Sequence, residues 1–247
     1  MEKEEYKNMY CEEDSYWWYI GLRNLIFSYV NKLNLNYNGL RLLDCGCGTG
    51  GLLEKCGHYK AIGMDISEEA IKFCNMRGLK KIAKASVSDV PFQNNSFDII
   101  TSMDVLYHNR VVNDLKALKE FYNILDKGGF LFLNLPAYDF MKSTHDEVVH
   151  TRERYTLMDL REKVKKAGFE IEMISYRNAF LFLPALLIRL IKKIFKQQNK
   201  GGSDLKATSG ILNKMFTLIL LVENKLILSG MKFPFGLSIF CLARKKM

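Results

Sequence analysis

The stretch Leu42-Leu43-Asp44-Cys45-Gly46-Cys47-Gly48-Thr49-Gly50-Gly51 decides the fold of this chain. An apolar run ends in an acid, a glycine-rich turn follows, and the segment from Leu52 to Cys56 then has a helical pattern. Glycine adopts positive φ easily and has no Cβ, so backbone N–H groups in such a turn can approach a ligand closely. The pattern predicts a buried strand, a tight loop and a helix, with a ligand bound at the carboxyl edge of a sheet.

The loop is compatible with two kinds of nucleotide ligand. Its glycines match the G-x-G-x-x-G pattern of dinucleotide sites. Asp44 favours a different ligand, because a carboxylate beside the loop repels a pyrophosphate but attracts an ammonium and a sulfonium group. Asp65 ends the next apolar run, Ile62-Gly63-Met64, and suits a ribose diol in either case. A nicotinamide dinucleotide (NAD) therefore stays as an alternative ligand.

An ordered set of motifs resembles the class I S-adenosylmethionine (SAM)-dependent methyltransferases. The set comprises Leu42–Gly50, Asp65, Asp89 and Leu125-Asp126-Lys127-Gly128-Gly129, in the order and spacing of that family. The resemblance implies SAM as cofactor, S-adenosylhomocysteine as product, and a doubly wound, Rossmann-like α/β sheet of seven strands whose last strand is antiparallel. It also implies that Asp89 accepts a hydrogen bond from the adenine amino group and that the N–H of Val90 contacts the ring. The residues expected to bind the cofactor are Asp44, Gly46, Cys47, Gly48, Gly50, Asp65, Ile66, Asp89, Val90 and Met103.

Short apolar segments alternate with helical patterns along the chain, which favours a parallel, doubly wound sheet. The predicted strands are 40–45, 59–64, 80–86, a fourth one from Ser96 onward, 130–135, 169–176 and 237–244. The predicted helices between them are 50–57, 68–77, 111–125 and 157–167. In the resembled family the last strand follows its predecessor closely, whereas here a long segment is inserted before it.

We expect four parts along the chain. Residues 1–38 form an N-terminal helical lid around Tyr16-Trp17-Trp18-Tyr19, which either covers the ligands or docks a helix on the sheet. Residues 39–176 form the SAM-binding core, 177–235 a helical insert, and 236–247 the final strand of the core.

The insert carries the positive charge of the protein. From Arg177 onward there are 13 Lys and Arg but only two Asp and Glu, while the whole chain has a net charge of +9. Pro184 is expected to start a basic amphipathic helix, residues 199–203 to form a hinge, and residues 205–229 to form a second helix. Two interpretations stay open for 184–229: contact with a membrane surface, or a cap over the substrate cleft or a dimer face. No apolar run is long enough to span a bilayer, and we expect no binding of nucleic acid.

Other features indicate the compartment. The N-terminus, Met1-Glu2-Lys3-Glu4-Glu5, has no apolar segment typical of a signal peptide. The six cysteines have neither a disulfide-framework spacing nor a zinc spacing. We expect a cytoplasmic protein without a metal, peripheral on the inner membrane face if the insert binds lipid.

Histidines are the candidate general bases. Methyl transfer from a sulfonium is an in-line displacement, so a base is needed only for a weakly acidic acceptor such as a hydroxyl. His108 follows the fourth predicted strand, and the segment 141–155 resembles a bacterial subgroup, of the type 11 and type 23 kind, that acts on small molecules and glycans. The catalytic candidates are His145, His150 and His108, and the candidate acceptor contacts are Arg154, Tyr155 and Tyr107.

The expected function is SAM-dependent methylation, most simply O-methylation, of a small-molecule, glycan or lipid-linked acceptor. A non-catalytic SAM-binding regulatory protein and an NAD-dependent oxidoreductase are the alternatives.

Overall fold

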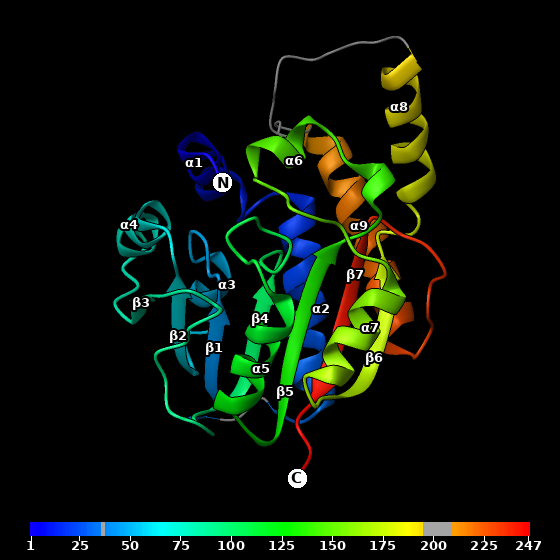
Figure 1. Cartoon of the computed structure of the whole chain (residues 1–247). Coiled ribbons are helices and arrows are strands. Elements are labelled where there is room, and N and C mark those ends of the chain that lie inside the picture. The colour runs from blue at the N-terminus through cyan, green and yellow to red at the C-terminus, as the bar shows by residue number, and fades with distance from the viewer. Residues whose placement is uncertain (36–37, 195–208) are drawn as a thin grey trace.

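The computed structural model describes residues 1–35, 38–194 and 209–247, and it contains a mixed sheet of seven strands (Figure 1). The strands are β1 (Arg41–Cys45), β2 (Lys60–Asp65), β3 (Ile82–Lys84), β4 (Phe97–Met103), β5 (Leu125–Pro136), β6 (Glu170–Arg177) and β7 (Ser238–Arg244). Their order is β3-β2-β1-β4-β5-β7-β6, and β7 is antiparallel to both of its neighbours. The topology confirms the predicted doubly wound sheet with an antiparallel last strand.

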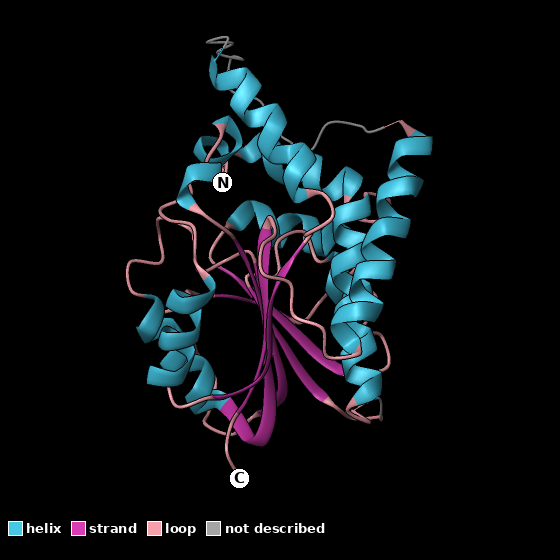
Figure 2. Cartoon of the chain, turned by 90° about the vertical axis from the view of Figure 1, so that its right-hand side faces the viewer, coloured by secondary structure: helices cyan, strands magenta, loops and turns pink. Residues whose placement is uncertain are grey.

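Helices cover both faces of the sheet (Figure 2). On one face, α5 (Asp114–Ile124) and α7 (Leu157–Lys166) bury side chains such as Phe121 and Leu160. On the other face, α2 (Trp17–Lys32) and α9 (Gly210–Leu228) bury Leu25 and Ile227 against the central strands. The strands read as continuous apolar runs because both of their faces are covered. Each fully buried side chain of this size stabilises the fold by about 1.5–3 kcal/mol.

The remaining helices are short or lie at the edges of the sheet: α1 (Lys3–Glu12), α3 (Gly51–Glu54), α4 (Glu68–Met76), a 3₁₀ turn (Asp139–Met141), α6 (Thr144–Val148) and α8 (Phe182–Ile194). The predicted start of α4 after Ser67 is confirmed. The sequence pattern did not predict α6. A capping box between Ser143 and Asp146 defines it, because each residue satisfies the backbone N–H of the other.

The N-terminal region divides into two helices with different places. Figure 1 shows α1 above the carboxyl ends of the strands, whereas α2 runs along the sheet. Tyr29 of α2 stacks on Phe240 of β7, with ring centroids 5.5 Å apart and an interplanar angle of 21°. The aromatic segment expected to be either a lid or a docking element lies at the start of α2, where Tyr16, Trp17, Trp18 and Tyr19 line the cavity described below while the rest of the helix packs on the sheet.

The insert differs from its predicted form at the start of its first helix. Helix α8 begins at Phe182, two residues before Pro184. Proline fits there because the first turn of a helix leaves its N–H groups without intrahelical acceptors. The expected hinge at 199–203 and the start of the second helix, 205–208, lie outside the described residues.

Helix α9 belongs to the layer on the sheet and is not a cap over the cleft. Its Asn224 donates to the carbonyl of Gly21 at 2.8 Å, and the Tyr29 hydroxyl donates to the Ile227 carbonyl at 3.2 Å. Glu223 is fully buried and accepts from the backbone N–H groups of Asn178 and Ala179. No helix in the described ranges combines the length and the apolar character that crossing a bilayer requires.

Candidate active site

A cavity of about 1310 Å³ lies at the carboxyl ends of β1, β2 and β4, where Asp44, Asp65 and Met103 line it. Residues of α1, α2, α6 and α8 complete its walls. Cavities for one small ligand are typically about 300–1,000 Å³, so this one has room for a donor and an acceptor together.

The glycine-rich loop forms one wall of the cavity. Gly46 has φ +79°, and a Cβ there would lie 2.3 Å from a methyl carbon of Val105. Gly50 has φ +87° at the N-cap of α3, where a Cβ would lie 2.5 Å from Leu79. Positive φ and the absence of space both require glycine at these two positions. Gly46, Cys47 and Gly48 line the cavity, so the loop backbone lies close to it, as the pattern predicted.

Two carboxylates stand beside the loop. Asp44, at the end of β1, is 4% exposed and accepts a hydrogen bond from the Thr101 hydroxyl at 2.7 Å. The pKa of Asp44 is raised to about 7, chiefly by burial and also by the negative charge of Asp65, although the bond from Thr101 lowers it. Asp65 accepts from the N–H groups of Gly48 at 3.0 Å and Ser67 at 2.9 Å. An environment that disfavours two negative charges favours a cationic ligand over a phosphate.

A third acid reaches the loop from the N-terminal region. Glu13, between α1 and α2, is buried and accepts from the Thr49 hydroxyl and from Arg77 at 2.8 Å. Burial raises the pKa of Glu13, while the bond from Thr49 and the charge of Arg77 lower it. This contact fixes the lid to the donor loop. The sequence gives no local signal for it, since Glu13 lies in a run of acids far from its partners.

Most of the residues expected to bind the cofactor lie together on the cavity wall. These are Asp44, Gly46, Cys47, Gly48, Asp65, Ile66 and Met103. Gly50 lies behind the loop, where it starts α3.

Asp89 and Val90 do not line the cavity. Asp89 is exposed and Val90 is buried in the core. A tight turn, in which the N–H of Asp89 donates to the Ser86 carbonyl at 3.0 Å, carries the chain away from the sheet edge before it reaches them. Ser86 and Val87 occupy the wall where the adenine contacts were expected.

Asp104, which the sequence analysis did not single out, follows Met103 at the end of β4 and lines the cavity. Its φ of +56° is unusual for a residue other than glycine. Both of its carboxylate oxygens accept from the side-chain amide of Asn134, at 3.0 and 3.1 Å. Burial raises the pKa of Asp104 to about 6, although the bond from Asn134 and the charge of Arg177 lower it. The signal that identified Asp44 and Asp65, an acid directly after an apolar strand, is also present here.

Arg177, at the end of β6, is a fully buried cation near this carboxylate. None of its side-chain nitrogens has a hydrogen-bond partner among the residues that the structure describes, and its guanidinium lies 5.6 Å from the ring of Trp18. Burial lowers the pKa of Arg177 to about 10, while the charges of Glu223 and Asp104 raise it. The cation favours the ionised form of Asp104, although Arg177 is not itself among the lining residues.

The three candidate histidines lie near α1 and are not equivalent. His108 and His145 line the cavity, and His145 lies 3.9 Å from Glu5. Burial lowers the pKa of His108 to about 4. His150 is not among the lining residues, and its Nε2 lies 3.1 Å from Glu2. The structure therefore brings two of the three histidines to the cavity.

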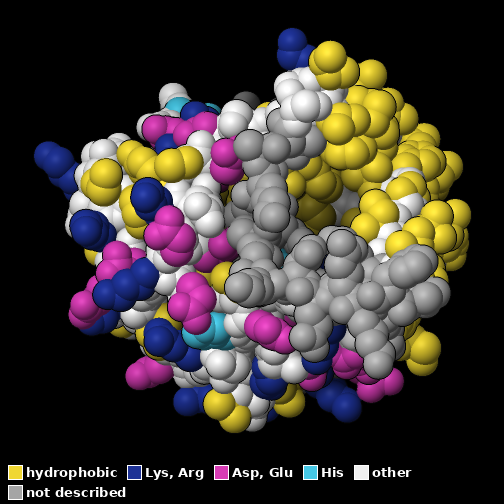
Figure 3. Space-filling model, turned by 90° about the horizontal axis from the view of Figure 1, so that it is seen from above, with side chains coloured by type: hydrophobic (Ala, Val, Ile, Leu, Met, Phe, Trp, Pro, Cys, Tyr) yellow, Lys and Arg dark blue, Asp and Glu magenta, His cyan; other side chains and the backbone are white. Residues whose placement is uncertain are grey.

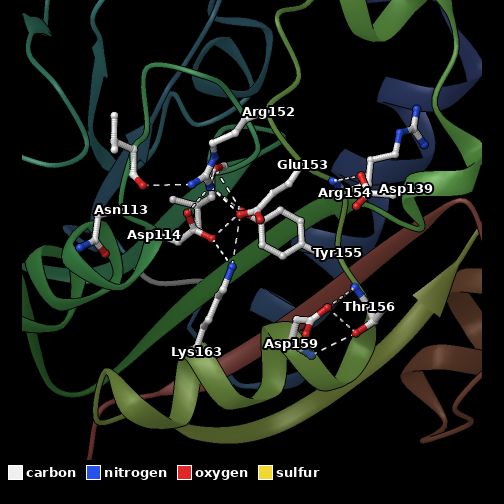
Figure 4. A network of polar contacts seen from close by, with 12 residues as sticks. Asn113, Asp114, Asp139, Arg152, Glu153, Arg154, Tyr155, Thr156, Asp159 and Lys163 are labelled. Atoms are coloured by element: carbon white, nitrogen blue, oxygen red, sulfur yellow. Dashed lines mark hydrogen bonds and ion pairs between the residues drawn. The ribbon is translucent and has the colours of Figure 1, made fainter.

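Two of the three residues expected to contact the acceptor line the cavity, and the third does not. Tyr107 and Arg154 line the cavity, but Arg154 is almost buried and pairs with Asp146 through two bonds of 2.8 and 2.9 Å. Tyr155 lies behind the wall, and its hydroxyl donates to Asp114 at 2.7 Å. Figure 4 shows Tyr155 within a network in which Asp114 also meets Arg152 and Lys163. This network joins the segment 152–155 to α5 and α7, and Tyr155 therefore stabilises the fold behind the cavity wall.

Metal ligands were not expected, and the described residues contain no group of three or more His, Cys, Asp or Glu that could hold a metal ion.

A solved structure and a family model match the fold described above. Phosphoethanolamine N-methyltransferase 2 from Haemonchus contortus, in complex with phosphomonomethylethanolamine and S-adenosylhomocysteine, matches with a TM-score of 0.56 and 20% identity over 91% of this chain and 53% of that protein. Residues 43–133 match the family model described as a methyltransferase domain. The chain carries a class I SAM-dependent methyltransferase domain. SAM is thus the cofactor, in place of the alternative ligand NAD.

Two curated relatives act on different kinds of acceptor atom. The chain is 31% identical over 178 residues to phosphoethanolamine N-methyltransferase 1 of Zea mays, a match that covers 66% of this chain and 34% of the maize protein. It is 28% identical over 166 residues to the ubiquinone biosynthesis O-methyltransferase of Bordetella avium, covering 59% of this chain and 68% of that protein. The chain therefore spans about a third of the length of the maize relative, and the relatives do not define its acceptor.

Proposed function

We propose that this chain transfers the methyl group of SAM to a small acceptor whose hydroxyl or amine hydrogen-bonds to Asp104. The position of Asp104 carries the proposal: it follows the cofactor-side residue Met103 and belongs to the same cavity wall as Asp44 and Asp65. When bound, SAM supplies an electrophilic methyl group, and the electrons of the broken C–S bond stay on sulfur.

The side chains of this cavity can perform three tasks. Asp44 attracts the ammonium of the donor, and the two acceptor lone pairs that Asp65 has left suit a ribose diol. Asp104 accepts the proton that the acceptor loses as its oxygen or nitrogen takes the methyl group. Trp17, Trp18 and Tyr107 line the same cavity and exclude water from it.

Asp104 is a better proton acceptor at neutral pH than His108. A base is most effective when its pKa lies near the working pH, and that of Asp104 is about 6 whereas that of His108 is about 4. His145 stays a second candidate because it also lines the cavity.

The proposed acceptors include amines as well as the hydroxyl compounds expected from the sequence. Hydroxyl and amine acceptors are both supported by relatives, one an O-methyltransferase and one an N-methyltransferase. Methylation of a small molecule, a glycan or a lipid-linked compound, as in the bacterial subgroup that residues 141–155 resemble, is part of the proposal.

A transfer assay with SAM labelled in the methyl group tests it. Extracts of the native cells, fractionated into polar metabolites and lipids, serve as acceptors. We expect labelled product with the natural chain and a loss of about a hundredfold or more in Asp104→Asn, the range that a general base supplies. Glu162→Gln, an exposed acid on α7, is the matched control.

S-adenosylhomocysteine binding, measured by calorimetry, should be unchanged in both variants, which shows that they are folded. Unchanged transfer in Asp104→Asn would contradict the role of Asp104. Tight donor binding without transfer to any fraction would favour the non-catalytic alternative.

A further inference from the structure

Apolar side chains are exposed on α8, α9 and the segments that flank them. Of the 19 large apolar residues exposed in the described part of the chain, 13 lie between Phe180 and Phe235. On the two helices these are Leu183, Leu187, Ile188, Leu190, Ile191, Ile211, Leu212, Met215, Leu218 and Val222. Figure 3 shows them gathered on one side of the upper face, with charged side chains on the other. An exposed apolar patch of this kind marks a site of interaction.

The charge around this apolar face has one sign. Among the described residues after Arg177 the only acid is Glu223, and it is fully buried. Lys214, Lys225 and Lys232 are exposed there. A second copy of the chain packed on this face would bring lysines toward lysines, whereas anionic lipid headgroups would compensate them.

Helix α8 connects the apolar face to the cavity. Ala185, Ile188 and Arg189 lie on one side of the helix, at a spacing of three and four residues, and line the cavity. Leu187 and Leu190 are 59% and 48% exposed and are not among the lining residues. Helix α8 therefore presents Ala185 and Ile188 to the cavity together with the cation of Arg189, and Leu187 and Leu190 to the surroundings.

We propose that the apolar face of α8 and α9 docks on an anionic bilayer, and that the acceptor is an amphiphile resident in that bilayer. Its polar head reaches Asp104, and its apolar part lies along Ala185 and Ile188. The inference rests on the proposed function, because it uses Asp104 as the acceptor-binding group. In this arrangement α8 and α9 lie in the interface, and no helix among the described residues is long and apolar enough to cross the bilayer.

Vesicle flotation tests the docking. The probes are vesicles of phosphatidylcholine alone and of phosphatidylcholine mixed with phosphatidylglycerol. The chain should float with the anionic vesicles and not with the neutral ones, and less so as salt is added. The double variant Leu187→Glu, Leu190→Glu should bind the anionic vesicles at least about tenfold more weakly, because it places charge in the apolar contact. Met158→Glu, at an exposed apolar residue of α7, is the matched control.

The second arm identifies the acceptor phase. Labelled SAM is supplied with a lipid extract of the native cells in the anionic vesicles, and the product is partitioned between chloroform and water. We expect the label in chloroform, and we expect the double variant to lose this transfer while it keeps its affinity for S-adenosylhomocysteine.

Three results would overturn the inference while leaving the proposed function intact. These are failure to float, label confined to a water-soluble product, and a dimer in light scattering that the double variant dissociates. Absence of label from both phases would overturn the proposed function itself.

Discussion

The side-chain amide of Asn134 donates to both carboxylate oxygens of Asp104, at 3.0 and 3.1 Å, while the Asn134 carbonyl accepts the backbone N–H of Asp104 at 2.8 Å. Asn134 is fully buried on β5 and pairs with Met103 of β4. It therefore holds Asp104 in a left-handed conformation that the chain would otherwise avoid. Asn134 is a positioning residue, because it orients Asp104 and is not among the residues that line the cavity.

Substitution of Asn134 should move the pH dependence of catalysis. For the natural chain we expect kcat/KM to rise with pH through about 6, because Asp104 acts as a base only when ionised. The bond from Asn134 lowers the pKa of Asp104, so Asn134→Ala should move this rise to higher pH as well as lower kcat. A pH–rate profile measures both effects. An unshifted profile with lower kcat would show that Asn134 has only a structural role.

Donor affinity should weaken in acid because of Asp44. Burial raises its pKa to about 7 in the free protein, and the ionised form is the one that attracts the ammonium of the donor. Below pH 7 the carboxyl is protonated before the donor binds, so the affinity for S-adenosylhomocysteine should fall by up to about tenfold per pH unit. Calorimetry across pH 5 to 8 measures this slope. Asp44→Asn should bind weakly throughout and without that slope; a slope that persists in the variant would assign it to another group.

The donor half of the site could be predicted because its signals are local. Asp44 and Asp65 each lie at the end of an apolar strand, and parallel strands bring their carboxyl ends to one edge. Asp104 has the same local signal, but the sequence analysis assigned the role of base to histidines, among them His108 four residues later. The pKa values of about 6 for Asp104 and about 4 for His108 depend on burial in the folded chain, which the sequence does not indicate.

Other features depend on contacts between distant segments and carry no sequence signal. Glu13 meets Arg77 across 64 positions, and the bond that joins Asn224 to Gly21 spans 203. The tight turn between Ser86 and Asp89 shifts the cavity wall by three residues relative to the motif-based prediction. The short length of β3, three residues against a predicted seven, has the same origin, because the chain turns away from the sheet after Lys84.

The contact between Glu13 and the donor loop should couple the lid to donor binding. Glu13→Gln keeps an acceptor for Thr49 but removes the charge that faces Arg77, whose side chain is 5% exposed. Breaking such a buried contact typically costs about 1–3 kcal/mol. We expect a lower melting temperature and a several-fold weaker affinity for S-adenosylhomocysteine, measured by thermal unfolding and calorimetry. Glu4→Gln, an exposed acid of α1, is the control and should change neither.

Tyr155 and Tyr107 should respond differently to the same substitution. Tyr155→Phe removes a hydroxyl that donates to the buried Asp114, while Arg152 and Lys163 still face that carboxylate. A hydrogen bond to a charged group contributes about 1.5–3 kcal/mol, so the free energy of unfolding should fall by about that amount. Because Tyr155 does not line the cavity, the acceptor KM should stay unchanged.

Tyr107→Phe should raise the acceptor KM with a smaller loss of stability, since its side chain lies on the cavity wall. Denaturant unfolding and steady-state kinetics on both variants separate the two roles, and a raised KM in Tyr155→Phe alone would reverse their assignment.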